Sequence, residues 1–251
     1  MRQPRLRVDA VTSLVIGSEG FIGRTFCEYL SYYDDVVRFD LVLGDDARWQ
    51  RLPQADKVYF LAWDVGGAKY LYDPRTQRDQ LEWNTALLNN VMPQLDAPFV
   101  FASSQLAGDG SVYGTLKLLG EQWTALLGGT SVRLWNVYGP HEQMTRRSHV
   151  VSDFFEQAKT GTILMWTTGE ERRQFVHIDD VCEALRTATG QGDVTTGVWT
   201  SVVELAHLIA AHYGAQVVPG REKGRTQPHT PDILPGWTAK VSLEEGLRRM
   251  R

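Results

Sequence analysis

The sequence predicts an α/β protein built on a doubly wound parallel sheet, and three observations lead to this fold class. Strand-like apolar runs alternate with helical patterns through the first half of the 251 residues. These strand-like runs are almost continuously apolar, which is typical of strands buried on both faces. Glycines also cluster where the first strand should turn into the first helix. The pattern changes near Pro140, which predicts a smaller second lobe.

Five apolar runs carry the prediction of the sheet, and helical patterns separate several of them. The runs predicted as strands are Thr12–Ile16, Val36–Asp40, Lys57–Ala62, Phe99–Ala102 and Ser131–Trp135. The predicted helices are Ile22–Tyr32, Gln77–Val91 and Val112–Leu127. Because a helix between two parallel strands must cross a face of the sheet, this order predicts helices on both faces.

The second half of the chain predicts a shorter set of elements. A polar segment, Gly139–Ser148, precedes them, and a loop rich in proline and glycine precedes the last helix. The elements are a helix at Val150–Thr160, a strand at Ile163–Trp166, a strand–helix unit at Gln174–Thr189, a helix at Val202–Tyr213, a strand at Gln216–Val218 and a helix near Leu243–Met250. We expect one domain at 1–137, with 174–200 returning to it. Segments 138–173 and 201–251 would form a small substrate-binding lobe.

Composition limits the classes of function. The formal net charge is −4, and no basic run follows a phosphate backbone, so nucleic acid is not an expected partner. Cys27 and Cys182 both fall in amphipathic helical patterns, which favours packing over a disulfide or a metal site. The polar, basic start of the chain has no apolar run behind it, and no run reaches membrane-spanning length. We therefore expect a cytoplasmic protein.

The glycine segment Gly17-Ser-Glu-Gly20-Phe-Ile-Gly23 is the most informative stretch of the chain. Glycines between a strand and a helix allow a tight turn, a close approach of the backbone to a pyrophosphate, and close packing of helix on sheet. The pyrophosphate would then lie at the helix N-terminus, where free N–H groups favour an anion. This pattern predicts a Rossmann-type dinucleotide site, and the alternative is a plain tight turn.

Asp40 ends the second predicted strand, 17 residues after Gly23. A carboxylate at this place accepts hydrogen bonds from the hydroxyls of the adenosine ribose and repels a 2′-phosphate. We therefore expect the cofactor to be NAD rather than NADP.

Tyr113 and Lys117 form the second strong feature, because a spacing of four residues puts both side chains on one face of a helix. A nearby ammonium favours the phenolate and lowers the pKa of a tyrosine, which then serves as a base. Ser103 and Ser104 end the preceding strand, where parallel sheets bind ligands. The alternative is that the two side chains share a helix face by chance.

With these residues assembled, the chain resembles the extended short-chain dehydrogenase/reductase family, in particular its nucleotide-sugar epimerases and dehydratases. The resemblance covers nearly the whole chain. Its further motifs are Leu61-Ala62, Asn84, the segment from Arg133 through Asn136 to Pro140, the segment Arg173–Asp180, and Gly236-Trp237 followed by Ser242–Gly246.

The resemblance implies a role for each matching position. Ser104, Tyr113 and Lys117 would be catalytic. Ser104 would bind the reacting oxygen of the sugar, with Ser103 as the alternative, and Tyr113 would exchange a proton with that oxygen. Lys117 would bind the nicotinamide ribose and lower the pKa of Tyr113. Tyr113 and Lys117 would also contact the cofactor. The other implied cofactor contacts are Gly17, Gly20, Phe21, Ile22, Gly23, Asp40, Leu61, Ala62 and Asn84. Asn136, Arg173 and Arg225 would hold the diphosphate of the substrate. Asn136 capping a turn, Arg225 in solvent and His177 as a packed residue are the plainer interpretations.

Two departures from the family pattern affect the choice of reaction. Gln105 and Leu106 follow Ser104 where the 4,6-dehydratases of the family place an aspartate and a glutamate, which disfavours that reaction. Tyr113 comes only nine positions after Ser104, so the loop that shapes the sugar pocket in relatives is short here. The pocket would either be open to a larger substrate or be closed by a different group.

The leading functional hypothesis is an NAD-dependent nucleotide-sugar epimerase that acts at C4. A reductase or dehydrogenase of the same family needs the same three residues and is the first alternative, and a non-enzymatic dinucleotide sensor is a distant one. The resemblance also implies a homodimer through the helices at Leu81–Val91 and Val112–Leu127. No residue indicates the base or the sugar of the substrate. Trp63 and Trp166 are candidates for stacking on a base or sugar, and core packing is the plainer interpretation of both.

Overall fold

A six-stranded parallel sheet forms the centre of the molecule in our computed structural model, which describes residues 11–142, 144–145, 147–226 and 229–250. The strand order is β2-β1-β3-β4-β5-β9, and every neighbouring pair is parallel. The strands are β1 (Thr12–Ile16), β2 (Asp35–Phe39), β3 (Lys57–Phe60), β4 (Phe99–Ser104), β5 (Thr130–Leu134) and β9 (Gly192–Val194). The predicted fold class is confirmed.

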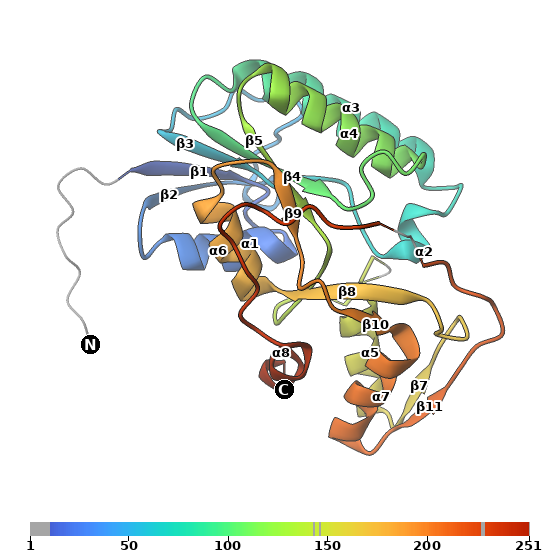
Figure 1. Ribbon diagram of the computed structural model, residues 1–251. Coiled ribbons are helices and arrows are strands. Elements are labelled where there is room, and N and C mark those ends of the chain that lie inside the picture. Colours follow the sequence, from blue (N-terminus) through green and yellow to red (C-terminus); the bar gives the residue numbers. More distant parts are fainter. Residues whose placement is uncertain (1–10, 143, 146, 227–228, 251) are drawn as a thin grey trace.

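Helices cover both faces of this sheet (Figure 1). Helices α1 (Phe21–Leu30) and α6 (Ile178–Thr187) pack on one face, and α3 (Gln77–Val91) and α4 (Val112–Leu126) on the other. Successive strand residues point to opposite faces, so Val15 belongs to the core under α1, whereas Leu14 and Ile16 belong to the core under α3. Because both faces of β1 are buried, its sequence is a continuous apolar run.

A second lobe lies beside the carboxyl ends of the main strands and has a core of its own. It holds a three-stranded sheet of β10 (Trp199–Ser201), β8 (Arg172–His177) and β6 (Asn136–Tyr138), and a two-stranded sheet of β11 (Gln216–Val218) and β7 (Thr162–Leu164). Helices α5 (Val150–Lys159) and α7 (Val202–Tyr213) pack against each other there, and α8 (Leu243–Arg249) contacts β8. The expected domain boundaries stay a prediction.

The structure adds short elements that periodicity did not indicate. They are β6, β9, β10, the one-turn helix α2 (Ala68–Leu71) and two short 3₁₀ turns, η1 (Leu41–Leu43) and η2 (Met92–Gln94). The predicted third strand also ends two residues early, because Leu61 and Ala62 both donate their N–H groups to the carbonyl of Ile16. The chain therefore bends away from the sheet at the point where the site begins.

Cys27 and Cys182 are both free and buried, as expected of packing residues.

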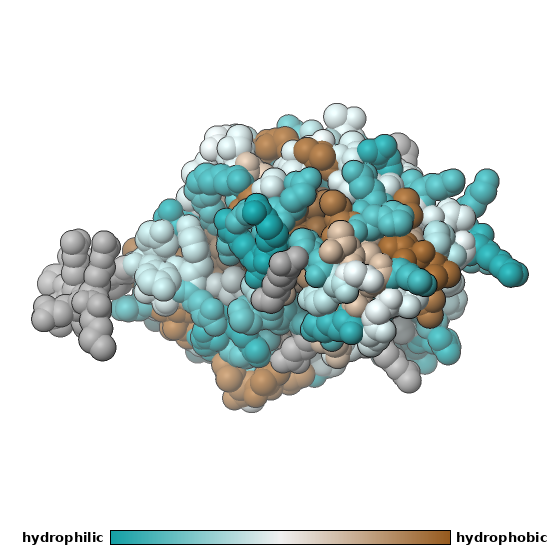
Figure 2. Space-filling view, turned by 90° about the horizontal axis from the view of Figure 1, so that it is seen from below, coloured by the Kyte–Doolittle hydropathy of each residue, from teal (hydrophilic) through white to brown (hydrophobic). Residues whose placement is uncertain are grey.

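Figure 2 shows a face on which hydrophilic residues predominate, with hydrophobic patches between them. Among the residues that the structure describes, no helix is long and apolar enough to cross a membrane.

Candidate active site

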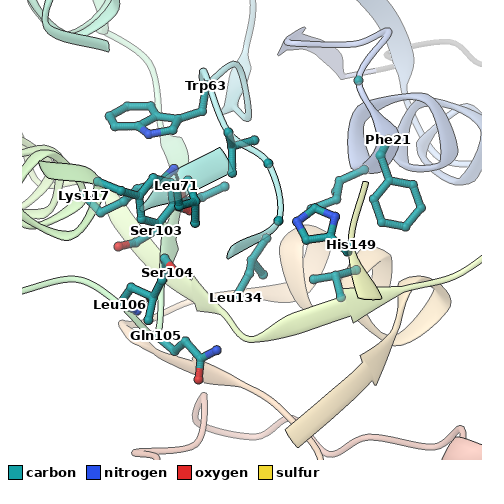
Figure 3. Close-up of a pocket in the computed structure, with 18 of the residues that line it drawn as sticks. Phe21, Trp63, Leu71, Ser103, Ser104, Gln105, Leu106, Lys117, Leu134 and His149 are labelled. Carbon is teal, nitrogen blue, oxygen red and sulfur yellow. Dashed lines mark hydrogen bonds between the residues drawn. The ribbon is translucent and has the colours of Figure 1, made fainter. Parts of the chain in front are cut away.

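One cavity of about 900 Å³ lies where the carboxyl ends of the central strands meet the second lobe. Its walls come from the glycine loop, from the ends of β2, β3 and β4, and from residues around β6 and β8. Figure 3 shows Trp63, Lys117, Ser103 and Ser104 on one side of it and Phe21 and His149 across from them. Every residue that the sequence predicted for catalysis, cofactor or substrate lines this cavity, except Asn84.

The glycine loop connects β1 to α1 in the conformation that a dinucleotide site requires. Gly17 has a φ of 89°, and a Cβ on it would lie 2.5 Å from the N atom of Ala62. A Cβ on Gly23 would lie 1.9 Å from the carbonyl oxygen of Gly17, so helix and loop pack too closely for any side chain. Gly20 is the N-cap of α1, and the first residues of the helix line the cavity. This geometry fits a pyrophosphate at the helix N-terminus.

Asp40 follows the end of β2 and lies beside the glycine loop. One oxygen of its carboxylate accepts a hydrogen bond from the N–H of Glu19 at 3.0 Å, and the other accepts from the N–H of Val42 at 2.9 Å. These bonds fix the carboxylate at the edge of the cavity, and its remaining acceptor positions would suit the hydroxyls of a ribose. The residues present therefore fit NAD.

Asn84 lies behind the wall of the cavity. Its side chain accepts from the N–H of Asp64 at 2.8 Å and donates to the carbonyl of Asp64 at 3.2 Å. The buried amide thus fixes the segment after Leu61 and Ala62, both of which line the cavity. The contact of Asn84 with the cofactor stays a prediction, and within the described chain its amide holds the segment that lines the cavity.

The two serines at the end of β4 have different surroundings. The hydroxyl of Ser103 donates to the carboxylate of Glu121 at 2.5 Å, and the same carboxylate forms a two-pronged ion pair with Arg133. The hydroxyl of Ser104 accepts from the N–H of Leu106 at 3.2 Å and hydrogen-bonds the side chain of Tyr113. Ser104 is therefore better placed than Ser103 to bind a reacting oxygen.

Tyr113 is buried in the first turn of α4. Burial raises the pKa of its phenol to about 12, and the hydrogen bond from Ser104 acts in the opposite direction. We expected Lys117 to lower the pKa of Tyr113, but within the chain alone that pKa is raised. The reason is geometric, because the Nζ of Lys117 lies 5.8 Å from the centre of the Tyr113 ring and donates to a backbone carbonyl instead.

The ammonium of Lys117 is also deeply buried. Its Nζ donates to the carbonyl of Ala102 at 2.6 Å and lies 3.9 Å from the centre of the Trp63 ring. Burial lowers the pKa of Lys117 well below its usual value, and the negative charge of Glu121, one turn further along α4, opposes that shift. The spacing of four residues thus aligns Tyr113, Lys117 and Glu121 on one side of the helix.

The short loop between Ser104 and Tyr113 forms compact turns beside the cavity. Ser111 caps α4 by accepting from the N–H of Gly114, and Asp109 accepts from the N–H of Ser111. The hydroxyl of Tyr72, just after α2, reaches Asp109 at 3.3 Å. Residues 65–68 and 71–72 line the cavity as well. The short loop and the segment around α2 therefore form adjacent parts of the cavity wall.

The predicted substrate residues line the second-lobe side of the cavity. Asn136 donates to the carbonyl of Gln174 at 2.9 Å, and Arg173 donates to the carbonyl of Arg225 at 2.8 Å. The side chain of Arg225 is exposed at the rim. His177 is buried and caps α6 by accepting from the N–H of Asp179, as expected of a packed residue. Two guanidinium groups at one wall suit a diphosphate.

His149 is a cavity residue that the sequence reasoning missed. Its Nδ1 lies 2.5 Å from a carboxylate oxygen of Glu142, and Glu142 also accepts from the hydroxyl of Ser152. A histidine oriented by a carboxylate is suited to proton transfer. The available signal was weak, since the histidine sits in a polar segment just before α5 and its partner becomes apparent only in three dimensions.

Comparison with known proteins places this geometry in a family. The pattern of the NAD dependent epimerase/dehydratase family matches residues 13–197, which is most of the chain. The chain belongs to this family. The family is one of enzymes that use NAD, which agrees with the expected cofactor and with the place of Asp40.

Curated relatives match the chain over part of its length. It is 30% identical over 164 residues to a dTDP-L-rhamnose 4-epimerase of Burkholderia thailandensis, an alignment that covers 56% of this chain and 45% of the relative. It is 32% identical over 147 residues to GDP-L-fucose synthase 1 of Arabidopsis thaliana, covering 50% of this chain and 44% of the relative. The aligned part thus spans less than half the length of either relative.

Solved structures share the fold over almost the whole chain. An epimerase of Methanothermobacter thermautotrophicus superposes with a TM-score of 0.81 at 20% identity, covering 96% of this chain and 91% of that one. A UDP-glucose 4-epimerase of Thermotoga maritima, solved with UDP-glucose, gives a TM-score of 0.76 at 24% identity, covering 96% and 97%. At these identities the likeness shows the fold alone.

Proposed function

We propose that this protein is an NAD-dependent nucleotide-sugar epimerase that inverts the C4 carbon of its sugar. The observation that carries the proposal is the meeting of Ser104, Tyr113 and Lys117 in one cavity with Asp40 at one end and Arg173 at another wall. The cavity therefore combines a proton-transfer group, a dinucleotide site and cations suited to a diphosphate.

The chain's own residues would bind, orient and exchange a proton. When bound, NAD supplies the acceptor for a hydride from the sugar carbon and returns that hydride. Asp40 and the glycine loop would hold the cofactor, and Arg173 and Arg225 would hold the diphosphate by charge-assisted hydrogen bonds. Tyr113 would take the proton of the sugar hydroxyl while Ser104 hydrogen-bonds the same oxygen. The oxidised carbon is planar, so a turn of the sugar in the cavity inverts it when the proton and hydride return.

The nearest alternative is a reductase or dehydrogenase of the same family, which uses the same residues but exchanges its cofactor after each reaction. A 4,6-dehydratase is disfavoured, because the cavity positions after Ser104 hold Gln105 and Leu106. Neither an amide nor an alkyl side chain exchanges protons near neutral pH.

The relatives and structural neighbours are named for dTDP-, GDP- and UDP-sugars, so a test of the substrate covers all three bases.

The test begins with the cofactor. We expect about one NAD per chain to survive purification and to be released by gentle denaturation, as read by absorbance and mass spectrometry. The protein would then be incubated with UDP-, GDP- and dTDP-hexoses without added reductant, and NMR would follow the anomeric signals for a C4 isomer. An empty site together with NADH-dependent turnover of a keto-sugar would favour the reductase, and no binding of NAD or NADH would refute both enzymes.

A further inference from the structure

Trp63 holds a position that the proposed reaction has not used. It comes directly after Leu61-Ala62, at the bend beyond β3, and its indole lines the cavity. Its ring packs against the rings of Phe60 at 6.3 Å and Phe101 at 5.7 Å between centroids. Within the described chain its buried Nε1 has no hydrogen-bond partner, so ring packing rather than the N–H holds the indole in place.

The indole face lies against the ammonium of Lys117 (Figure 3). The Nζ lies 3.9 Å from the centre of the Trp63 ring and 5.0 Å from that of Phe101, and it donates to the carbonyl of Ala102. An ammonium has three N–H donors, and burial without compensation favours its neutral form. Tryptophan provides the strongest cation–π partner among the side chains, and its attraction grows when the cation is desolvated.

We infer that Trp63 is a positioning residue that keeps the ammonium of Lys117 charged and held at the carbonyl of Ala102 by presenting its indole face to Nζ. The inference rests on the proposed function, because a charged lysine matters only where Tyr113 must release a proton. The ionisable groups near Lys117 are Tyr113 and Glu121 on α4, with Arg133 of β5 paired to Glu121. Ser103 and the carbonyl of Ala102 contribute polar atoms from β4. Trp63 contributes its indole face from the loop after β3, and the ring of Phe101 on β4 lies further from Nζ.

The Nζ of Lys117 lies 5.8 Å from the centre of the Tyr113 ring, so a charged Lys117 attracts a phenolate formed during proton transfer, although burial dominates in the chain alone and raises the pKa of Tyr113 to about 12. Without the indole face, desolvation would convert more of Lys117 to the neutral amine, and Tyr113 would lose that support. Trp63 would therefore act on catalysis through Lys117 without touching the sugar.

The test varies the electron density on the indole face of Trp63 while nearly keeping the shape of the side chain. Protein would be produced with ordinary, monofluorinated or trifluorinated tryptophan, since fluorine withdraws electron density from the ring face and weakens cation–π attraction. Lysine labelled with ¹³C at Cε reports the ionisation of each of the six lysines by NMR. Lys117 would be assigned through the loss of its signal in K117M.

We expect the ionisation midpoint of Lys117 to fall in steps with fluorination, by about half a pH unit or more at the highest substitution. Lys159, an exposed lysine paired with Glu156, serves as the internal reference and should not move. The matched control is W63F, in which position 63 stays aromatic but carries no fluorine, so fluorination should leave the midpoint of Lys117 unchanged.

Equal shifts of Lys117 with and without Trp63, or no shift in the wild-type protein, would overturn the inference. The wild-type series needs no substitution at position 63, so a folding defect of W63F does not block the test. The titration also needs no sugar substrate. A failed epimerase assay alongside a fluorine-dependent Lys117 midpoint would refute the proposed function alone.

Discussion

At the scale of single residues, the proposed chemistry depends on the hydroxyl of Tyr113, which burial holds at a pKa of about 12. Replacing Tyr113 with phenylalanine keeps the ring and its packing but removes the proton-transfer group. We expect the Y113F variant to lose a factor of about 10²–10⁴ in turnover, the usual contribution of a general acid or base. NMR detection of the isomerised sugar measures the rate, and NAD content and melting temperature should stay unchanged.

The matched control for Y113F is Y213F. Tyr213 packs edge-on against Phe155 in the second lobe, and its ring lies in a different part of the fold from the cavity. Y213F should keep full activity. Comparable activity of Y113F and the wild-type protein would assign the proton transfer to another group, for which His149 is the first candidate.

At the scale of elements, Glu142 joins the segment before α5 to the helix itself. Burial raises the pKa of Glu142, but its hydrogen bonds with His149 and Ser152 outweigh burial and leave the pKa below the ordinary value of 4.5. A lowered pKa means that the carboxylate stabilises the fold above about pH 4.5 and that this stabilisation disappears as the pH falls through the folded-state pKa. We expect E142Q to reduce the free energy of unfolding at pH 7 by about 1–3 kcal/mol.

Urea unfolding of wild type and E142Q at pH 7, 5 and 3.5 measures this difference, which should shrink below pH 4.5. The matched control is E156Q on α5, because Glu156 is half-exposed and pairs with Lys159 at the surface. Its effect should stay within about 0.5 kcal/mol. A difference between wild type and E142Q that is constant with pH would show that the carboxylate contributes no charge-dependent stability.

The elements also show which parts of the fold local sequence can predict. The predicted bounds of α7 match the structure, because Ser201 and Glu204 form a capping box at its start and Gly214, with a φ of 66°, ends it. Strands β6, β9 and β10 escaped prediction. Each pairs with a segment distant in the sequence, which the local pattern does not reveal, and length alone does not separate them from β7 and β11, which also have three residues and were predicted.

The same distinction applies to the site. The glycine loop, Asp40, Tyr113 and Lys117 were predictable because each depends on spacing along one strand–helix unit. The pairing of His149 with Glu142 and the contact of Trp63 with Lys117 were not, since both arise where separate segments meet. The raised pKa of Tyr113 depends on burial, which spacing along the chain does not reveal.

At the scale of the whole molecule, the outer surface of α3 and α4 carries exposed leucines. These helices lie side by side over one face of the sheet (Figure 1). The exposed leucines on and just after them are Leu81, Leu118, Leu119, Leu126 and Leu127. A surface with this many apolar side chains is typical of an interface between subunits, and we expect two copies to pair through it about a twofold axis.

Light scattering coupled to size-exclusion chromatography tests this pairing. We expect the mass of a dimer for the wild-type protein and the mass of a monomer for L119R, because a buried arginine without a partner opposes association. The matched control is L164R, which places the same charge on an exposed leucine of β7 in the second lobe and should stay dimeric. If both variants remain dimers, the copies pair through another surface. If the wild-type protein is a monomer, the leucines of α3 and α4 remain exposed to solvent, and helix α4 is supported by its own sheet alone.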